Sequence, residues 1–378
     1  MGKQVILKGG QLLDIYNNYR FHKKEILIEN GLISEIADEI KSRKDSEVVH
    51  LDNQIIAPGF IDIHTHVYGD RTSLGVEADT VGVYSGCTTI FDAGSAGAKN
   101  FNDFKEQVIK NSRTRVISLI NIAYTGLEEE RFELADFKNI NLAALRDIVK
   151  SNKNHIKGIK ARASASTVGK LGIRPIEIAK EISSELGLPL VVHIGNLPPA
   201  IEDVLNLLNK GDVITHCFHG KENGLLNDNR HLRRETSKAI DRGVLFDIGH
   251  GTSSFNFNVA ADAIKQNFYP DIISTDIYRQ NYKGPVYSLA LTINKMMALG
   301  LNIEACISKV TTVPALNFKL DRIGMIKRGY MADFTVFNLI DKAVTLEDSD
   351  GNLLNNNKYL QVACTIKGGE LINVEDNK

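Results

Sequence analysis

The chain has few cysteines, little net charge and no long apolar run, and each shortage excludes a class of protein. Its four cysteines, Cys87, Cys217, Cys306 and Cys364, lie far apart without a Cys-x-x-Cys pair, which favours free cytosolic thiols over a disulfide framework. The formal net charge of −1 gives no reason to expect a nucleic acid as partner. No stretch approaches the length of a membrane span, and residues 1–8 lack the apolar core of a signal peptide. We therefore expect a cytoplasmic protein without a nucleic acid or membrane partner.

Two histidines, His64 and His66, end a short apolar run that follows Ala57-Pro58-Gly59. Side chains alternate between the faces of a strand, so we expect both imidazoles on the same face. Imidazole is a common ligand for zinc and other transition metals, and two on one face form half of a metal site. Two unrelated surface histidines would give the same pattern, so the assignment depends on further ligands downstream.

Polar residues end further apolar runs along the chain, and each run is followed by a segment that reads as a helix. These residues are, in order, Lys160, His193, His216 and Asp276. The other expected strands are residues 88–92, 115–122 and 243–248. Alternating strands and helices with polar residues at the strand ends are typical of a (β/α)8 barrel, whose active site lies at the carboxyl ends of the strands. We predict an α/β fold with a TIM-like barrel over residues 58–320.

Both ends of the chain read as β-structure. Strand-like runs near the start occupy residues 5–7, 25–28 and 32–36, and Asn30-Gly31 between the last two indicates a hairpin turn. Runs near the end occupy residues 334–337, 343–346 and 362–366, with a polar loop expected at residues 352–358. We expect residues 1–57 and 321–378 to pack together as one small β-sandwich domain beside the barrel.

With these residues in place, the chain resembles the amidohydrolase superfamily in its binuclear-metal form with a lysine. Within it, the chain is similar to the dihydroorotase-like deacetylases, which are often labelled dihydroorotase or adenine deaminase by analogy. The resemblance spans nearly the whole chain, including residues 52–59 and 324–337. It implies one metal held by His64, His66 and Asp276, and a second held by His193 and His216. The ligand types suit two divalent ions such as zinc.

Lys160 would bridge the two metals, although a lysine ammonium repels cations. Burial beside metal ions favours the neutral amine, which can add carbon dioxide and become an anionic carbamate. The resemblance implies this modification, whereas spacing alone does not indicate it. A surface lysine is the usual alternative.

The resemblance also implies the chemistry. A hydroxide shared between the metals would attack the substrate carbonyl, and Asp276 would take the proton and pass it to the leaving group as a general acid. We expect a metal-dependent hydrolase that cleaves an amide or ester bond of a small carboxylate-bearing substrate, such as an N-acyl amino acid or an acylated hydroxy acid. The alternatives are a cyclic amide hydrolase of the dihydroorotase or hydantoinase type, a purine deaminase, and a non-catalytic scaffold with the same fold.

Three features argue against these alternatives. Tyr68 stands where dihydroorotases carry the arginine that binds the substrate carboxylate. Adenine deaminases of the superfamily have a glutamate on the fourth strand, where this chain has Lys160. Scaffold members have lost metal ligands, whereas this chain retains all six.

The residues that contact substrate are harder to identify. Arg162, two residues after Lys160, shares its face and is a candidate for binding a carboxylate, with a salt bridge near the barrel rim as an equal alternative. His219, His250 and Tyr124 lie in loops that follow barrel strands and are candidates for orienting the substrate. The other histidines are interpreted as structural or surface residues: His22, His50, His155 and His231. A homo-oligomer is expected because barrels of this class commonly associate.

Overall fold

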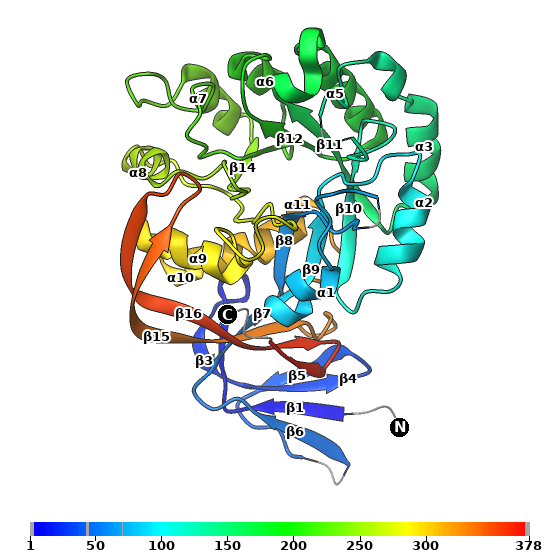
Figure 1. Cartoon of the computed structure of the whole chain (residues 1–378). Helices are drawn as coiled ribbons and strands as arrows, with labels where there is room; N and C mark the ends of the chain where they lie inside the picture. The colour runs from blue at the N-terminus through cyan, green and yellow to red at the C-terminus, as the bar shows by residue number, and fades with distance from the viewer. Residues whose placement is uncertain (1–3, 43–44, 70, 130, 375–378) are drawn as a thin grey trace.

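A curled parallel sheet forms the centre of the molecule (Figure 1). The computed structural model describes residues 4–42, 45–69, 71–129 and 131–374. The sheet has seven strands in the order β14-β13-β12-β11-β10-β9-β8, and every pair is parallel. Its strands are β8 (Phe60–Thr65), β9 (Cys87–Asp92), β10 (Arg115–Asn121), β11 (Ile156–Ala163), β12 (Leu190–Ile194), β13 (Val213–Thr215) and β14 (Leu245–Asp247).

The segment that contains Asp276 lies between the first and last strands of this sheet. A parallel bridge joins Ile272 to Asp247 of β14, and a second joins Ile277 to Thr65 of β8. The sequence predicts a continuous eighth strand here, but the described backbone forms isolated bridges instead. Asp276 has a φ of 49°, which an extended strand does not allow. The α/β barrel fold is confirmed, with its eighth strand reduced to these contacts.

The barrel strands are buried on both faces. All six residues of β8 and all six of β9 are buried, as expected for a parallel sheet covered by helices. Alternate residues from several strands, among them Ile61, Phe91, Ile117 and Val191, form one apolar cluster inside the curled sheet. Phe318, just after α11, packs into the same cluster. The interior is therefore a packed core, and the polar residues lie at the carboxyl ends of the strands.

Helices follow the strands and cover the outside of the sheet (Figure 1). Their bounds are α1 (Ala78–Val81), α2 (Phe101–Phe104), α3 (Leu142–Ser151), α4 (Ala165–Val168), α5 (Arg174–Leu186), α6 (Ile201–Leu207), α7 (Arg234–Asp241), α8 (Phe257–Lys265), α9 (Leu289–Ala298), α10 (Ile303–Lys309) and α11 (Thr312–Asn317). In α5, Pro175 occupies the first turn, and the buried residues Ile176, Ala179 and Ile182 share one face. Among the described residues, none of these helices is long and apolar enough to cross a membrane.

Two further sheets form the smaller unit below the barrel in Figure 1. One has the order β5-β4-β1-β6, and the other has the order β17-β16-β15-β7-β2-β3. Their strands are β1 (Gln4–Lys8), β2 (Gln11–Asp14), β3 (Tyr19–Lys23), β4 (Glu25–Glu29), β5 (Leu32–Ala37), β6 (Ser46–His50), β7 (Ile55–Pro58), β15 (Phe334–Glu347), β16 (Leu353–Lys367) and β17 (Glu370–Asn373). The turn at Asn30 and Gly31 joins β4 to β5, as predicted.

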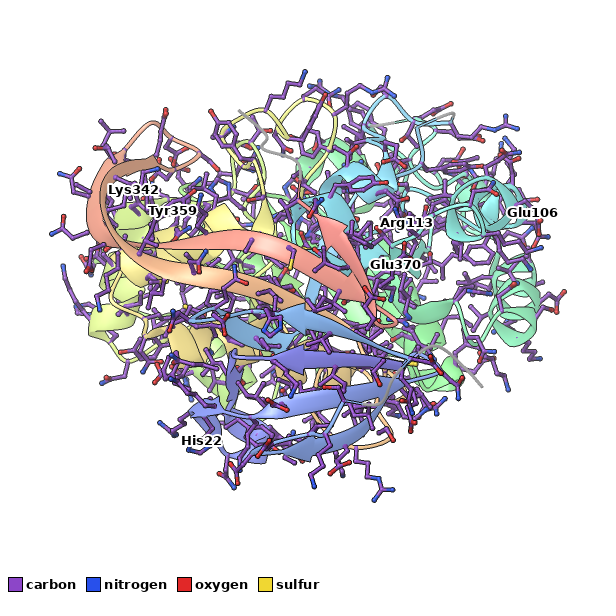
Figure 2. All side chains as sticks on the ribbon, turned by 90° about the horizontal axis from the view of Figure 1, so that it is seen from below. His22, Glu106, Arg113, Lys342, Tyr359 and Glu370 are labelled. Atoms are coloured by element: carbon purple, nitrogen blue, oxygen red, sulfur yellow. The ribbon has the colours of Figure 1, made fainter. Side chains whose placement is uncertain are left out.

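Both chain ends contribute to one apolar core between these sheets. Val5 and Ile28 from the start of the chain pack in the same cluster as Phe334 and Ile366 from its end. Figure 2 shows this unit from below, with His22 exposed on a strand far from the barrel mouth. These contacts support our proposal that residues 1–57 and 321–378 form one domain and residues 58–320 the other.

β15 and β16 form one long hairpin, and its outer half rises beside α9 toward α8 (Figure 1). The polar loop predicted at residues 352–358 is therefore wrong, because β16 begins at Leu353. Its polar side chains reflect exposure of this part of the hairpin to solvent rather than a loop. Lys342 lies over the ring of Tyr359, 5.1 Å from the ring centroid (Figure 2).

Candidate active site

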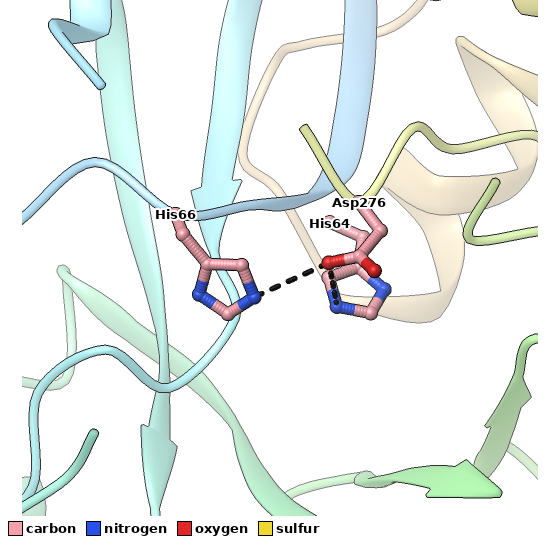
Figure 3. A group of neighbouring side chains, drawn as sticks. All are labelled: His64, His66 and Asp276. Atoms are coloured by element: carbon pink, nitrogen blue, oxygen red, sulfur yellow. Dashed lines mark ion pairs between the residues drawn. The ribbon is translucent and has the colours of Figure 1, made fainter. Parts of the chain in front are cut away.

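Three of the predicted ligands, His64, His66 and Asp276, meet at the carboxyl end of the barrel strands (Figure 3). The Oδ1 atom of Asp276 lies 3.2 Å from Nε2 of His64 and 3.3 Å from Nε2 of His66. The ligand atoms of all three residues lie within 4.8 Å of one another. Both imidazoles therefore point to the same side, as strand alternation predicted.

The other three predicted ligands lie beside this group. His193 of β12 and His216, which follows β13, approach each other with 2.8 Å between Nδ1 of His193 and Nε2 of His216. The same Nε2 atom of His216 is 4.0 Å from Oδ2 of Asp276. Lys160 of β11 places its Nζ atom 3.2 Å from Nε2 of His64. The fold thus brings together residues that are spread over more than two hundred positions of the chain.

Hydrogen bonds on the far side of two rings fix where their protons lie. Thr215 Oγ1 donates to Asp247 at 2.7 Å, so its oxygen accepts from Nδ1 of His64 at 2.9 Å. His216 donates from Nδ1 to the carbonyl oxygen of Gly249 at 2.6 Å, because a carbonyl can only accept. Both Nε2 atoms therefore carry a lone pair into the site, which is the arrangement that a metal-binding histidine needs.

Burial keeps these imidazoles neutral. Burial, followed by the charge of Lys160, holds the pKa of His64 well below its ordinary value. Burial and the neighbouring His216 do the same to the pKa of His193. Burial lowers the pKa of His216 to about 4, although the charge of Asp276 acts in the opposite direction. Neutral imidazole is the form that binds metals, so the site does not have to lose protons from these rings.

Lys160 is buried, with 1% of its surface exposed. Burial lowers its pKa to about 8, and the charges of Asp276 and Asp247 limit the decrease. A pKa this close to neutrality leaves part of the population as the free amine, which can react with carbon dioxide. The environment of Lys160 therefore meets the requirement for a carbamate.

The donor atoms suit divalent metal ions. Tetrahedral zinc with bonds of about 2.0–2.1 Å would separate its ligand atoms by about 3.3 Å. The contacts of Asp276 with His64 and His66 are 3.2 and 3.3 Å, whereas the 2.8 Å between His193 and His216 would have to widen. For His64 and Asp276, two lone-pair atoms face each other with no proton between them. A cation between those atoms would relieve this repulsion.

Backbone conformation also marks the site. Asp276 and His216 have φ angles of 49° and 73°, in the left-handed region that costs energy for residues other than glycine. Gly251 packs against Asp276, because a Cβ atom on Gly251 would lie only 2.6 Å from Oδ2 of Asp276. Strain of this kind persists where surrounding contacts hold a residue in place, and it clusters at functional sites.

A pocket of about 180 Å³ opens onto five of the six predicted ligands. It is lined by His64, His66, Leu74, Lys160, Arg162, His193, Lys221, Thr252, Ser253, Ser254, Asp276 and Tyr278. Arg162 thus faces the pocket, as predicted from its position two residues after Lys160. Its Nε atom also donates to Glu133 at 2.6 Å, which is the salt bridge given as the alternative for this residue, whereas contact of Arg162 with a substrate carboxylate stays a prediction.

The comparisons with known proteins agree with this geometry. The model of the amidohydrolase family matches residues 55–372. The chain belongs to the amidohydrolase family. A protein named deacetylase from Enterococcus faecalis is 38% identical over 351 residues, covering 92% of this chain and 94% of the relative. A second protein named deacetylase, from Brucella anthropi, is 35% identical over 351 residues, covering 92% of this chain and 87% of the relative.

The solved structures of similar proteins carry a different name. A crystal structure of an adenine deaminase is 36% identical and has a TM-score of 0.93, covering 98% of this chain and 100% of that chain. The predicted superfamily and enzyme class of this amidohydrolase are confirmed. The names of its relatives differ, so the reaction has to be argued from the site.

Three predicted substrate contacts of this amidohydrolase lie outside the pocket wall. His219 is buried, and its Nδ1 accepts from the backbone N–H of Lys221 at 3.1 Å. His250 is buried between loop and helix, and its Nε2 accepts from Lys295 of α9 at 2.7 Å. Tyr124 is half-buried and packs against the apolar core. Direct contact of these residues with substrate remains a prediction.

The pocket also contains residues that sequence reasoning missed. Lys221 and the loop residues Thr252, Ser253 and Ser254 line it, and Thr252 hydrogen-bonds to the hydroxyl of Tyr278. These residues follow no strand directly, and no periodicity marks them. The only available signal is that they lie in loops after β13 and β14, which is where barrel enzymes carry their specificity.

Proposed function

We propose that this amidohydrolase is a metal-dependent deacylase that hydrolyses the amide or ester bond of a small N-acyl amino acid or acylated hydroxy acid. The observation that carries the proposal is the convergence of four imidazoles, Lys160 and Asp276 beside a pocket with further cationic side chains. The similar proteins named deacetylase, at 38% and 35% identity, support the same reaction type.

His64, His66 and Asp276 would hold one divalent ion, and His193 and His216 a second. Such ions supply a water molecule of lowered pKa and polarise the carbonyl group of the substrate. We propose zinc as the metal, because nitrogen and carboxylate donors suit it. The hydrogen bonds from His64 to Thr215 and from His216 to Gly249 keep the two rings in the orientation that binding needs.

Lys160 would join the two metal sites as a carbamate. The lone pair of its neutral amine attacks the carbon of carbon dioxide, an N–C bond forms, and one proton leaves to solvent. The product carries one negative charge on two oxygens, so Lys160 would offer the metals an anionic ligand in place of a repulsive ammonium. The 1% exposure of Lys160 would protect this group from solvent.

Asp276 would move the proton. Its carboxylate lines the pocket beside His64 and His66, and 14% of its side chain is exposed. It accepts a proton from the attacking water and donates it to the leaving nitrogen or oxygen as the bond to the acyl carbon breaks. The acyl group leaves as a carboxylate, and the remaining product as an amine or alcohol.

The alternatives have less support. Tyr68 is fully buried and donates its hydroxyl to Asp103, away from the pocket, so no substrate-binding side chain stands where dihydroorotases carry an arginine. The lysine on β11 also differs from the glutamate of adenine deaminases. The complete ligand set argues against a scaffold. The cytoplasmic location and a homo-oligomeric state remain predictions.

A substrate screen tests this proposal. The purified full chain would be incubated with zinc and bicarbonate, then assayed against N-acetyl, N-formyl and O-acetyl derivatives of both enantiomers of amino and hydroxy acids. Dihydroorotate, hydantoins and adenine serve as controls. We expect turnover of an acyl derivative and none of the controls. Turnover of a control alone, or no turnover at all, would contradict the proposal.

A pair of histidine variants shows whether the activity comes from this site. His193→Ala should lower the rate by orders of magnitude and reduce metal content, with the fold retained. His231→Ala is the matched control, because His231 is exposed and does not line the pocket. Equal activity of the two variants would exclude His193 from the metal site.

A further inference from the structure

Lys221 is a half-buried lysine in the wall of the active-site pocket, and its charge has no partner in the part of the chain that the structure describes. Its side chain is half-buried and lines the same pocket as His193 and Asp276. Among the described residues, its ammonium has no hydrogen-bond or ion-pair partner within reach. Burial lowers the pKa of Lys221, while the charges of Asp276 and Asp350 raise it. A partly buried cation without a partner is costly, and an anionic ligand in the pocket would compensate for that cost.

Arg162 differs from Lys221 in this respect. The side chain of Glu133 is completely buried and accepts from Nε of Arg162 at 2.6 Å. The pair is close to neutral as a unit, so Arg162 already has a carboxylate partner. Of these two cations in the pocket wall, Lys221 is the one whose charge is still available to a ligand.

A buried imidazole, that of His219, holds the loop that carries Lys221. The backbone N–H of Lys221 donates to Nδ1 of the buried His219 at 3.1 Å. His219 follows the proposed ligand His216 by three residues, so the imidazole fixes the backbone of the loop relative to the end of β13. This gives the buried His219 a role in positioning Lys221.

The hairpin of β15 and β16 holds the same loop from the outside. A Cβ atom on Gly220 would lie 2.5 Å from Oδ2 of Asp350, which shows how closely the hairpin tip approaches the loop. The same Oδ2 accepts from Asn256 at 2.6 Å, and Ser349 Oγ donates to the carbonyl oxygen of Gly251 at 2.9 Å. The tip therefore touches the loops after both β13 and β14.

We infer that Lys221 binds the negatively charged group of the substrate, held in place by His219 and the tip of the β15–β16 hairpin. This inference rests on the proposed function, and it assigns the residue that recognises the carboxylate of the acyl amino acid or acylated hydroxy acid. Discrimination between acid and neutral analogues then depends on one lysine in a loop rather than on the metal ligands.

The test compares an acid with its neutral analogue. Wild type, Lys221→Met, Lys221→Arg and Arg162→Met would be assayed with the N-acetyl amino acid that is turned over best and with its primary amide. The ratio of kcat/KM for the acid over the amide should fall about 10- to 150-fold in Lys221→Met, mainly through a higher KM for the acid. Lys221→Arg should restore most of the ratio. Lys238→Met is the matched control, because Lys238 is exposed on α7 and its loss changes the net charge equally.

Equal ratios in Lys221→Met and Lys238→Met would overturn the inference, and so would a loss of discrimination confined to Arg162→Met. If the wild-type enzyme turns over neither an acyl amino acid nor an acylated hydroxy acid, the proposed function fails, and binding of benzoate and benzamide then decides the role of Lys221. Tighter binding of benzoate than of benzamide by wild type, lost in Lys221→Met but kept in Lys238→Met, would support it. Equal affinities for the two probes in wild type would contradict it.

Discussion

Replacing Thr215 by valine should weaken metal binding without touching a metal ligand. The Thr215 hydroxyl accepts from Nδ1 of His64 at 2.9 Å and donates to Asp247 at 2.7 Å, and all three residues are buried. Valine has nearly the same shape but neither bond. His64 then loses the acceptor that keeps its proton on Nδ1, and the proton can move to Nε2, the atom that faces Asp276 at 3.2 Å.

The size of the effect follows from these contacts. Leaving a buried N–H without a partner costs about 1–3 kcal/mol. A change of this kind behind a metal-binding histidine typically lowers metal affinity about 10- to 100-fold. The two figures agree, because a factor of ten corresponds to about 1.4 kcal/mol. We therefore expect Thr215→Val to bind zinc about 10- to 100-fold more weakly than wild type.

The assay is competition for zinc between the protein and a chelator of known affinity, in bicarbonate buffer. Thr365→Val is the matched control, because Thr365 is equally buried but its hydroxyl makes no hydrogen bond to any described residue. The control should bind zinc like wild type. Equal zinc affinity of the Thr215 and Thr365 variants would refute the reasoning, because it would mean that the proton position on His64 does not matter.

The other predictions concern the carboxylates. Asp276→Asn should nearly abolish turnover while retaining at least one metal per chain by elemental analysis; near-normal turnover would exclude proton transfer through Asp276. Gly251→Ala, which places a Cβ atom 2.6 Å from Oδ2 of Asp276 at a φ of 55°, should lower kcat and destabilise the fold by about 1 kcal/mol in denaturant unfolding. Asp333→Asn removes the partner of Arg115 and Lys367 and should cost about 3 kcal/mol at neutral pH. Burial raises the pKa of Asp333, but the charges of Lys367 and Arg115 outweigh it and leave the pKa below its ordinary value. The difference in unfolding free energy between wild type and Asp333→Asn should therefore have its largest value above about pH 4 and decrease as the pH falls below it. A difference that does not change with pH would contradict this.

The barrel strands that carry the proposed ligands could be predicted from the sequence, because the patterns that indicate a strand lie within a few neighbouring residues. The end of an apolar run indicates approximately where a barrel strand stops: β12 ends one residue after His193, whereas β11 continues three residues past Lys160. Strand alternation was enough to place His64 and His66 on one side. The prediction of a continuous eighth strand is wrong, because the left-handed backbone at Asp276 depends on its contacts with neighbouring segments.

The walls of the pocket could not be predicted in the same way. Arg162 is paired with Glu133, which comes from a loop after a different strand, and no pattern in the sequence connects the two. Lys221 is placed by His219 within its own loop and by Asp350 from the far end of the chain. The sequence also predicts a loop in part of the hairpin that carries Asp350, because polar residues on an exposed strand resemble those of a loop.

Anomalous diffraction at the zinc edge, on crystals grown with zinc and bicarbonate, tests the central claim most directly. We expect two peaks about 3.5–4 Å apart at the carboxyl end of the barrel, with continuous density from Lys160 to both. One peak should be bonded to His64, His66 and Asp276, and the other to His193 and His216. Crystals with zinc bound elsewhere, or with an unmodified Lys160 and no peak among these residues, would contradict it.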